Sequence, residues 1–228
     1  MTTSGEAKQT AAPLPFFDPV RIICSIAGQR KGVPLNKELL KQNFEAHGFS
    51  VLFFDTADDA AAYLTEKLAG QTVGFGDSET LISMKMYERL TAAGCTVWFH
   101  KVPDHPPDVL IRARDAGWYL LSANGISETG EIVNIDGNGN RLTSTTFGKK
   151  TVFFVAGRNK VVPTMYDAIV RAENTARPLN AKKYLGADAP QEALEARMER
   201  MDRAVLILKK PVYGMKAELI LIDEDLGF

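Results

Sequence analysis

A Gly-x-Gly stretch after an apolar run has the residue types of an anion-binding loop. It reads VGFGDSET over residues 73–80. Glycines let the backbone approach a ligand closely, and amide N–H groups at a helix start point toward negative charge. The pattern matches neither a Walker A loop nor the dinucleotide fingerprint. We expect either a phosphate or carboxylate cradle or a tight strand-to-helix turn with Ser78 as N-cap. Asp77 and Glu79 add negative charge, which weighs against the first. The candidate ligand-binding residues are Gly74, Gly76, Ser78 and Thr80.

A second candidate stretch, ANGISETG over residues 123–130, follows an apolar run that ends near Ser122. Ligands of open α/β sheets bind at the carboxyl ends of the strands, so Asn124 is a candidate ligand-binding residue. A carboxylate at that edge can act as a base or nucleophile if its surroundings raise its pKa. Glu128 is therefore the candidate catalytic residue. The alternative is a solvent-facing Glu in a turn flanked by glycines.

Two further turns carry cations and amides. IDGNGNR, residues 135–141, is typical of a tight hairpin because Asn and Gly tolerate positive φ. Asn140 and Arg141 are candidates there, since an Arg fork binds carboxylate or phosphate, although Arg141 can equally pair with Asp136. GRNK, residues 157–160, offers Asn159 and Lys160 to an anionic ligand or forms a solvated turn.

The sequence gives little support for a metal site or a disulfide. The histidines and aspartates of HKVPDHPPD, residues 100–108, fit no standard zinc spacing, so we expect no metal site. The two cysteines, Cys24 and Cys95, lie in apolar runs and are interpreted as buried strand thiols. Without a disulfide framework or a CxxC motif, a reducing, cytoplasmic setting is expected.

Composition excludes several classes of function. The 228-residue chain has a formal net charge of -1 and no basic stripe, so we expect no nucleic-acid partner. No apolar run approaches the ~18 residues of a membrane span, and the N-terminus lacks the apolar core of a secretory signal. We therefore expect no membrane partner. The first ~15 residues are small, polar and Pro-containing, and we expect a flexible N-terminal arm over residues 1–18 before one domain over residues 19–228.

Alternating strand-like and helix-period segments predict an α/β fold with a mostly parallel sheet flanked by helices. The segment 21–27 fits a strand or a helix start equally well. Thr56 with Asp59 is similar to a capping box. Expected strands are 50–55, 72–76, 95–100, 118–122 and 150–157, with an added β-hairpin over 131–148 and a closing strand pair, 204–210 and 217–226. Expected helices are 35–47, 56–68, 80–93, 106–117, 163–176 and a charged helix over 191–204.

Taken in order, GFGDSET, SANGISETGEIVNIDGNGNR, GRNKVV and RPLNAKKY resemble the lactate-utilisation family, the LUD domain. The similarity spans roughly residues 30–182 and the ending LILIDEDLGF. It implies the fold shared by sugar-phosphate isomerases, coenzyme A transferases and a formyltetrahydrofolate cyclo-ligase. In that superfamily the Gly-rich first loop binds phosphate or carboxylate, and coenzyme A transferases use a Glu followed shortly by Gly as nucleophile. Glu128-Thr129-Gly130 is similar in form.

The chain departs from this family after Leu179-Asn180-Ala181-Lys182, where many similar members carry a cysteine cluster. No cysteine follows here. Iron–sulfur clusters need about four thiolates, so we expect none in this chain. The resemblance implies a non-redox subunit or accessory of L-lactate oxidation to pyruvate that binds a small anionic metabolite and iron–sulfur partner subunits. The alternatives are a stand-alone enzyme on a phosphorylated sugar, acyl-coenzyme A or folate-type substrate, and a non-catalytic ligand-binding module. A homodimer is the default assembly.

Overall fold

The structure is a computed structural model, and it describes residues 34–228. The expected N-terminal arm, the segment 21–27 and Cys24 lie outside the described residues. No helix in the described part of the chain is long and apolar enough to cross a membrane.

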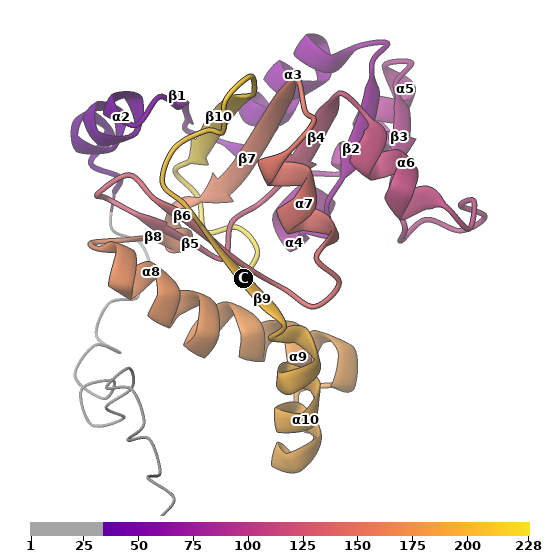
Figure 1. Cartoon of the computed structure of the whole chain (residues 1–228), viewed down its shortest axis with the longest axis vertical. Coiled ribbons are helices and arrows are strands. Elements are labelled where there is room, and N and C mark those ends of the chain that lie inside the picture. Colours follow the sequence, from indigo (N-terminus) through magenta and orange to yellow (C-terminus); the bar gives the residue numbers. More distant parts are fainter. Residues whose placement is uncertain (1–33) are drawn as a thin grey trace, which may run out of the picture.

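A six-stranded sheet forms the centre of the molecule, in the order β1-β10-β7-β4-β2-β3 (Figure 1). Every adjacent pair in it is parallel, which confirms the predicted α/β class. The strands are β1 (Ser50–Phe54), β2 (Thr72–Phe75), β3 (Thr96–Trp98), β4 (Trp118–Leu121), β7 (Thr151–Gly157) and β10 (Lys216–Ile222).

Both faces of this sheet are covered, as its apolar central strands require. Along β7, Phe153 and Val155 join one hydrophobic cluster, whereas Val152, Phe154 and Ala156 join the other, because successive side chains point to opposite faces. The first cluster packs under α3 (Ala57–Leu68), α4 (Glu79–Ser83) and α5 (Met86–Ala92). The second packs under α2 (Lys37–Ala46), α6 (Val109–Asp115) and a second sheet.

The second sheet has four short strands in the order β8-β5-β6-β9. They are β5 (Gly125–Ser127), β6 (Ile132–Asp136), β8 (Val161–Val162) and β9 (Ala204–Leu208). Strand β6 is antiparallel to both of its neighbours, and β5 pairs with β8 in parallel. Helix α8 (Met165–Arg171) packs on the face that turns away from the main sheet, where Ala168 meets Val133 and Ile135.

The helix caps follow the sequence signals. Thr56 Oγ1 accepts a hydrogen bond from the Asp59 N–H at 3.1 Å, and Thr56 caps α3 as predicted. Ser78 Oγ accepts from the Leu81 N–H at 3.4 Å, which confirms Ser78 as the N-cap of α4. The single helix expected over 80–93 is divided into α4 and α5, because Lys85 between them takes a left-handed φ of 52°.

The predicted hairpin around Gly137 is wrong. Helix α7 (Asn140–Thr146) begins where the second strand was expected, after Gly139 at φ 75°. The amides of Asn138 and Arg141 donate to the Asp136 carboxylate at 3.1 and 2.9 Å, so a side chain satisfies this turn in place of a partner strand. Strand β6 instead forms a hairpin with the preceding strand, β5, and the turn of this hairpin lies over 128–131.

The expected closing strand pair is also wrong. Strand β9 pairs with β6 in the second sheet, whereas β10 inserts between β1 and β7 in the main sheet. The two segments therefore belong to different sheets and do not pair with each other.

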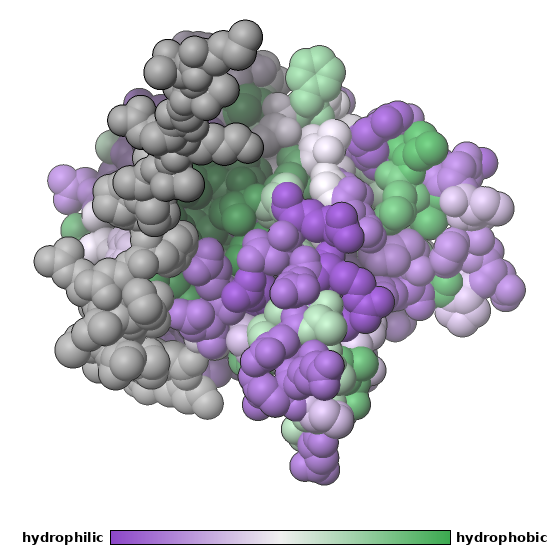
Figure 2. All heavy atoms as spheres, turned by 60° about the horizontal axis from the view of Figure 1, so that its bottom comes forward, coloured by the Kyte–Doolittle hydropathy of each residue, from purple (hydrophilic) through white to green (hydrophobic). Residues whose placement is uncertain are grey.

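A helical extension, residues 177–201, follows α8 and projects away from both sheets (Figure 1). It comprises α9 (Arg177–Leu185) and α10 (Gln191–Met201), the predicted charged helix. A π-helical segment, η3 (Ala172–Ala176), joins α8 to α9 just before Pro178. Because proline donates no backbone hydrogen bond, a widened turn beside it is expected. Mostly hydrophilic side chains cover the extension (Figure 2).

Candidate functional site

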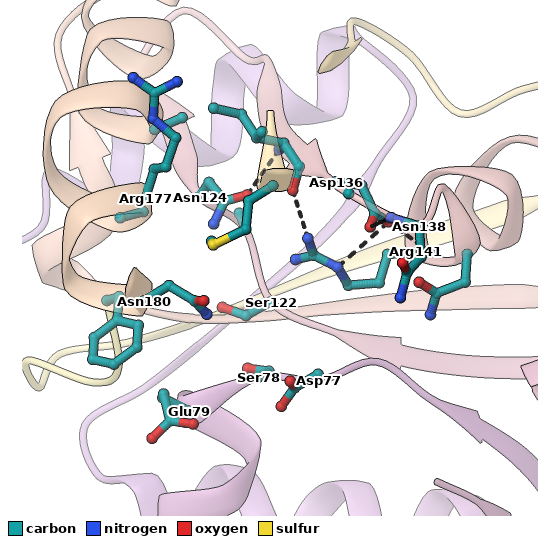
Figure 3. Close-up of a pocket in the computed structure, with 18 of the residues that line it drawn as sticks. Asp77, Ser78, Glu79, Ser122, Asn124, Asp136, Asn138, Arg141, Arg177 and Asn180 are labelled. Atoms are coloured by element: carbon teal, nitrogen blue, oxygen red, sulfur yellow. Dashed lines mark hydrogen bonds and ion pairs between the residues drawn. The ribbon is translucent and has the colours of Figure 1, made fainter. Parts of the chain in front are cut away.

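A polar pocket of about 480 Å³ opens at the carboxyl ends of three neighbouring parallel strands. The stretch 77–79 follows β2, the stretch 122–124 follows β4, and Lys160 in the short helix η2 (Arg158–Lys160) follows β7. The β6–α7 turn supplies a second wall and the helical extension a third (Figure 3). This is the edge at which ligands of open α/β sheets bind.

Positive charge predominates in this pocket. Seven Lys and Arg residues line it, against three Asp and Glu residues. The cations are Lys101, Arg141, Lys160, Arg177, Arg197, Arg200 and Arg203, and the acids are Asp77, Glu79 and Asp136.

Each of the three carboxylates already has a cationic partner. Asp136, which is buried, lies 3.5 Å from Arg141 Nε. Asp77 lies 3.6 Å from Lys101 Nζ. Glu79 pairs with Lys183 at the rim. The acids therefore do not neutralise the remaining cations.

Several basic side chains have no carboxylate within ion-pair distance among the described residues: Lys160, Arg197, Arg200 and Arg203. Arg197 packs over the ring of Tyr184, with Cζ 4.3 Å from the ring centroid. The Nε atoms of Arg177 and Arg197 are buried and have no hydrogen-bond partner in the described structure. Buried donors of this kind are rare, and an anion in the pocket would supply the missing acceptor.

Lys160 is the most enclosed cation of the pocket, with 3% of its surface exposed. Its Nζ donates to Ser122 Oγ at 2.9 Å, and Ser122 Oγ lies 3.4 Å from Thr80 Oγ1. Burial, and secondarily the charges of Arg171 and Arg141, hold the pKa of Lys160 well below its usual value, while Glu79 opposes the shift. Burial disfavours the charged form of an amine, so the neutral amine of Lys160 is favoured over the ammonium.

The β6–α7 turn is a rigid wall. Besides its pairing with Asp136, Arg141 donates from its guanidinium to the carbonyl of Ile135. Asn124 Oδ1 accepts from the Ile135 N–H at 2.8 Å, which ties the end of β4 to β6. Arg171 completes the frame, since its guanidinium donates to the carbonyls of Asn124 and Asn159. The Asn-rich and Gly-rich stretch is thus a set of fixed hydrogen bonds.

His100 also lines the pocket, and it is half-buried. Its Nδ1 is buried and has no hydrogen-bond partner among the described residues. Burial lowers the pKa of His100, although Asp77 acts in the opposite direction. The neutral imidazole therefore predominates near neutral pH.

The structure brings five of the ten predicted site residues into this pocket: Ser78, Asn124, Asn140, Arg141 and Lys160. The other five, Gly74, Gly76, Thr80, Glu128 and Asn159, are not among the lining residues. Thr80 and Asn159 lie behind the wall, where Thr80 Oγ1 donates to the Leu226 carbonyl at 3.2 Å and Asn159 Oδ1 accepts from the Leu226 N–H at 3.1 Å.

Close packing of the backbone accounts for Gly74. A Cβ built on it would lie 2.2 Å from the carbonyl oxygen of Ala113, so the glycine lets α6 approach β2. Gly76 lies at the end of the same strand, and its N–H donates to Leu120 O at 2.7 Å.

Glu128 lies in the β5–β6 turn beside α2. Its N–H donates to Val162 O at 2.8 Å, and its carbonyl accepts from Asn43 Nδ2 at 2.6 Å. The pocket is lined without it. Its catalytic role stays a prediction.

Arg177 and Asn180 of α9 were missed from the sequence, as were the three arginines at 197, 200 and 203. Arg197, Arg200 and Arg203 recur every three residues, a spacing that places Arg197 and Arg200 on one face of α10, with Arg203 just beyond its end. That repeat is the signal that points to them. The segment was instead interpreted as a charged surface helix.

The model of the LUD domain family matches residues 37–192, which is more than half of the chain. The chain belongs to the LUD domain family. This confirms the resemblance drawn from the sequence motifs and relates the chain to lactate-utilisation proteins. Among solved structures, a DUF162 family protein from Deinococcus radiodurans is similar, with a TM-score of 0.49 and 14% sequence identity over 83% of this chain and 99% of that chain. No curated protein matches.

The LUD domain match ends within α10, at residue 192. The three arginines at 197, 200 and 203 lie beyond it. Within the matched part, the family supplies the strand-end loops and the β6–α7 turn. The pocket of this LUD domain chain therefore combines family elements with a cationic wall from the segment that follows them.

Proposed function

We propose that this LUD domain protein binds a small metabolite carrying a carboxylate or phosphate, and that it does so in lactate utilisation. The observation that carries the proposal is the set of pocket arginines without a carboxylate partner among the described residues: Arg197, Arg200 and Arg203. The planar forks of arginine side chains are the usual protein partners of such anions.

The dimensions and position of the pocket support this proposal. A volume of about 480 Å³ falls in the range typical of small-molecule sites. Fixed polar groups, among them Asn124 and Ser122, stand at the strand ends, where they can orient a ligand. Arginines of the helical extension lie on the opposite side of the pocket from these groups, so a small anion can be held from two sides.

A non-redox part in the pathway is the role we propose for this chain. It has two cysteines, and the described one, Cys95, is buried and donates from Sγ to Leu68 O at 2.9 Å. An iron–sulfur cluster takes about four thiolates. Electron transfer in this scheme belongs to iron–sulfur partner subunits, and the present chain binds the metabolite.

A thermal-shift panel tests ligand binding. Lactate, pyruvate, succinate, inorganic phosphate and a sugar phosphate are compared, with matched chloride salts as controls. A ligand at a hundredfold its Kd adds about 2.7 kcal/mol, which for a chain of this size raises Tm by roughly 5–10 °C. The proposal requires such a rise with at least one anion. A Tm that no anion changes would overturn it.

A further inference from the structure

The Ser122–Lys160 pair has the arrangement of a nucleophile and its base. The two side chains follow adjacent strands, β4 and β7, and the Lys160 Nζ to Ser122 Oγ distance is 2.9 Å. A hydroxyl becomes a useful nucleophile when a neighbouring group within hydrogen-bond reach can take its proton. Serine–lysine pairs are one known solution to this requirement.

The surroundings of the pair suit that chemistry. Ser122 is 8% exposed and Lys160 3%, and both line the pocket, so the hydroxyl is accessible from the cavity while the amine lies behind it. Figure 3 shows Ser122 between Ser78 and the β6–α7 wall. Burial and the positive charges of Arg171 in α8 and Arg141 in α7 favour the neutral amine that a base requires, whereas the carboxylate of Glu79 in α4 opposes them.

We propose that Ser122 and Lys160 form a catalytic dyad that cleaves a small ester or thioester bearing a carboxylate or phosphate. The inference rests on the proposed function, because the arginines of the helical extension would hold the anionic end of the substrate. It goes beyond binding in assigning a reaction to the pocket.

The reaction balances with water as the only co-reactant. Lys160 Nζ takes the Ser122 proton as Oγ bonds to the acyl carbon, and the carbonyl becomes an oxyanion. Collapse of this intermediate breaks the bond to the leaving group, to which the Lys160 ammonium returns the proton, so an alcohol or thiol departs. Water then attacks the acyl–Ser122 ester, Lys160 takes its proton, and cleavage of the C–Oγ bond releases the acid and restores Ser122.

Asn124 is placed to assist as a hydrogen-bond donor. Its Oδ1 is committed to the Ile135 N–H, and within the described structure its Nδ2 donates to no acceptor. It lines the same pocket as Ser122, two residues away in the chain. An amide fixed in this way is the kind of donor that stabilises an oxyanion.

The test uses the full chain and 4-nitrophenyl hemisuccinate, an activated ester with a carboxylate at its far end. Nitrophenolate release and intact mass are followed together, and the modified residue is mapped by peptide sequencing. We expect a burst and one succinyl group on Ser122. The neutral ester 4-nitrophenyl acetate is expected to react more slowly because it lacks the anionic anchor.

Variants separate the dyad from general reactivity. Ser122→Ala is expected to lose the burst and the adduct, whereas Ser50→Ala, an exposed serine on the edge strand β1, keeps both. Lys160→Met is expected to slow acylation by about 10²–10⁴-fold, the usual contribution of a general base, and to flatten the rise of the rate with pH.

Calorimetric titration with succinate distinguishes the two proposals. Succinate binding without any succinyl–Ser122 adduct would overturn the dyad and leave the binding function standing. Failure of both would overturn both. In a further experiment the protein is mixed with pyruvate and treated with borohydride, which reduces any imine between the two to a stable adduct. An adduct on Lys160 would show that the amine itself is the nucleophile and would also overturn the dyad.

Discussion

The phenolic hydroxyl of Tyr184 donates a hydrogen bond to Asp77 Oδ2 at 2.9 Å, joining the helical extension to the loop after β2. Lys101 Nζ donates to the same hydroxyl at 2.8 Å, and the neighbouring Lys183 pairs with Glu79. Two consecutive residues of α9 thus contact one strand-end loop. Because Arg197 packs over the Tyr184 ring, these contacts also position a pocket cation.

Removing the Tyr184 hydroxyl therefore affects binding more than stability. Tyr184→Phe is expected to weaken succinate binding several-fold, because the extension loses its link to Asp77. The free energy of unfolding should change by less than about 1.5 kcal/mol, the usual net value of one hydrogen bond. Titration calorimetry and urea unfolding measure the two effects. Tyr213→Phe, at an exposed position outside the pocket, serves as the control and should change neither. Equal affinity in Tyr184→Phe and wild type would rule out this role.

The Asp136–Arg141 pair should matter mainly for stability. Asp136 is 4% exposed and accepts from two backbone amides besides pairing with Arg141. Asp136→Asn is expected to lower the free energy of unfolding by about 3 kcal/mol, since it removes the charge that a partly buried arginine faces. Asp115→Asn breaks an exposed pair with Arg114 and should cost less than about 1 kcal/mol. Urea unfolding that showed similar losses for both would refute this account of the turn.

Lys160 predicts a pH dependence of stability. Its pKa in the folded chain lies below the ordinary value of 10.5. Between the folded pKa and 10.5 the unfolded chain therefore binds more protons than the folded chain, and stability rises with pH. Lys160→Met lacks this contribution. From about pH 7 to about pH 10 the free energy of unfolding of the wild type should increase relative to that of the variant. A constant or falling difference would contradict the burial of a low-pKa amine.

Gly227 allows the C-terminal residues to lie against Thr80. Its φ is +63°, and a Cβ there would lie 2.6 Å from Thr80 Oγ1 and 2.8 Å from Thr80 N. Gly214 also has positive φ, at +79°, but a Cβ there would meet nothing within 4 Å. Both Gly227→Ala and Gly214→Ala should lower the free energy of unfolding by about 1 kcal/mol through backbone strain, and Gly227→Ala should lower it further because of the contact with Thr80. Unfolding in urea compares them. Equal losses would show that the contact with Thr80 is unimportant.

The sequence was sufficient for the main sheet and for most helices, because these elements bury regular apolar patterns. Residues 152–156 are an unbroken apolar run, typical of a central parallel strand, and β7 is one. Thr56 and Ser78 were recognised as caps because capping depends on residues three positions away in the chain. Such local interactions can be inferred without the tertiary structure.

The errors are one turn whose side-chain hydrogen bonds were not recognised and one strand pairing that distant contacts decide. Asn and Gly at 137–140 suit a hairpin, yet the carboxylate of Asp136 organises the turn and α7 begins there. The segment 204–210 is strand-like, but nothing in its pattern says that β6, some seventy residues earlier in the chain, is its partner. Register between strands far apart in sequence depends on packing that a linear pattern does not encode.

The candidate site could be predicted in part for the same reason. Strand-end loops carry their chemistry in short motifs, which led to Ser78, Asn124, Arg141 and Lys160. The opposing wall of the pocket comes from α9 and α10. Their arginines can be recognised as pocket residues only once the extension is folded against the loop at Asp77. A charged surface helix and a ligand-facing helix have the same composition.

Titration calorimetry with succinate on the wild type and on Arg197→Gln tests the central claim most directly, with Arg114→Gln, an exposed arginine outside the pocket, as the matched control. The account predicts binding that weakens about tenfold or more in Arg197→Gln, or at least ~1.4 kcal/mol, and is unchanged in Arg114→Gln. Binding that is equal in all three proteins would place the anion elsewhere and contradict the account.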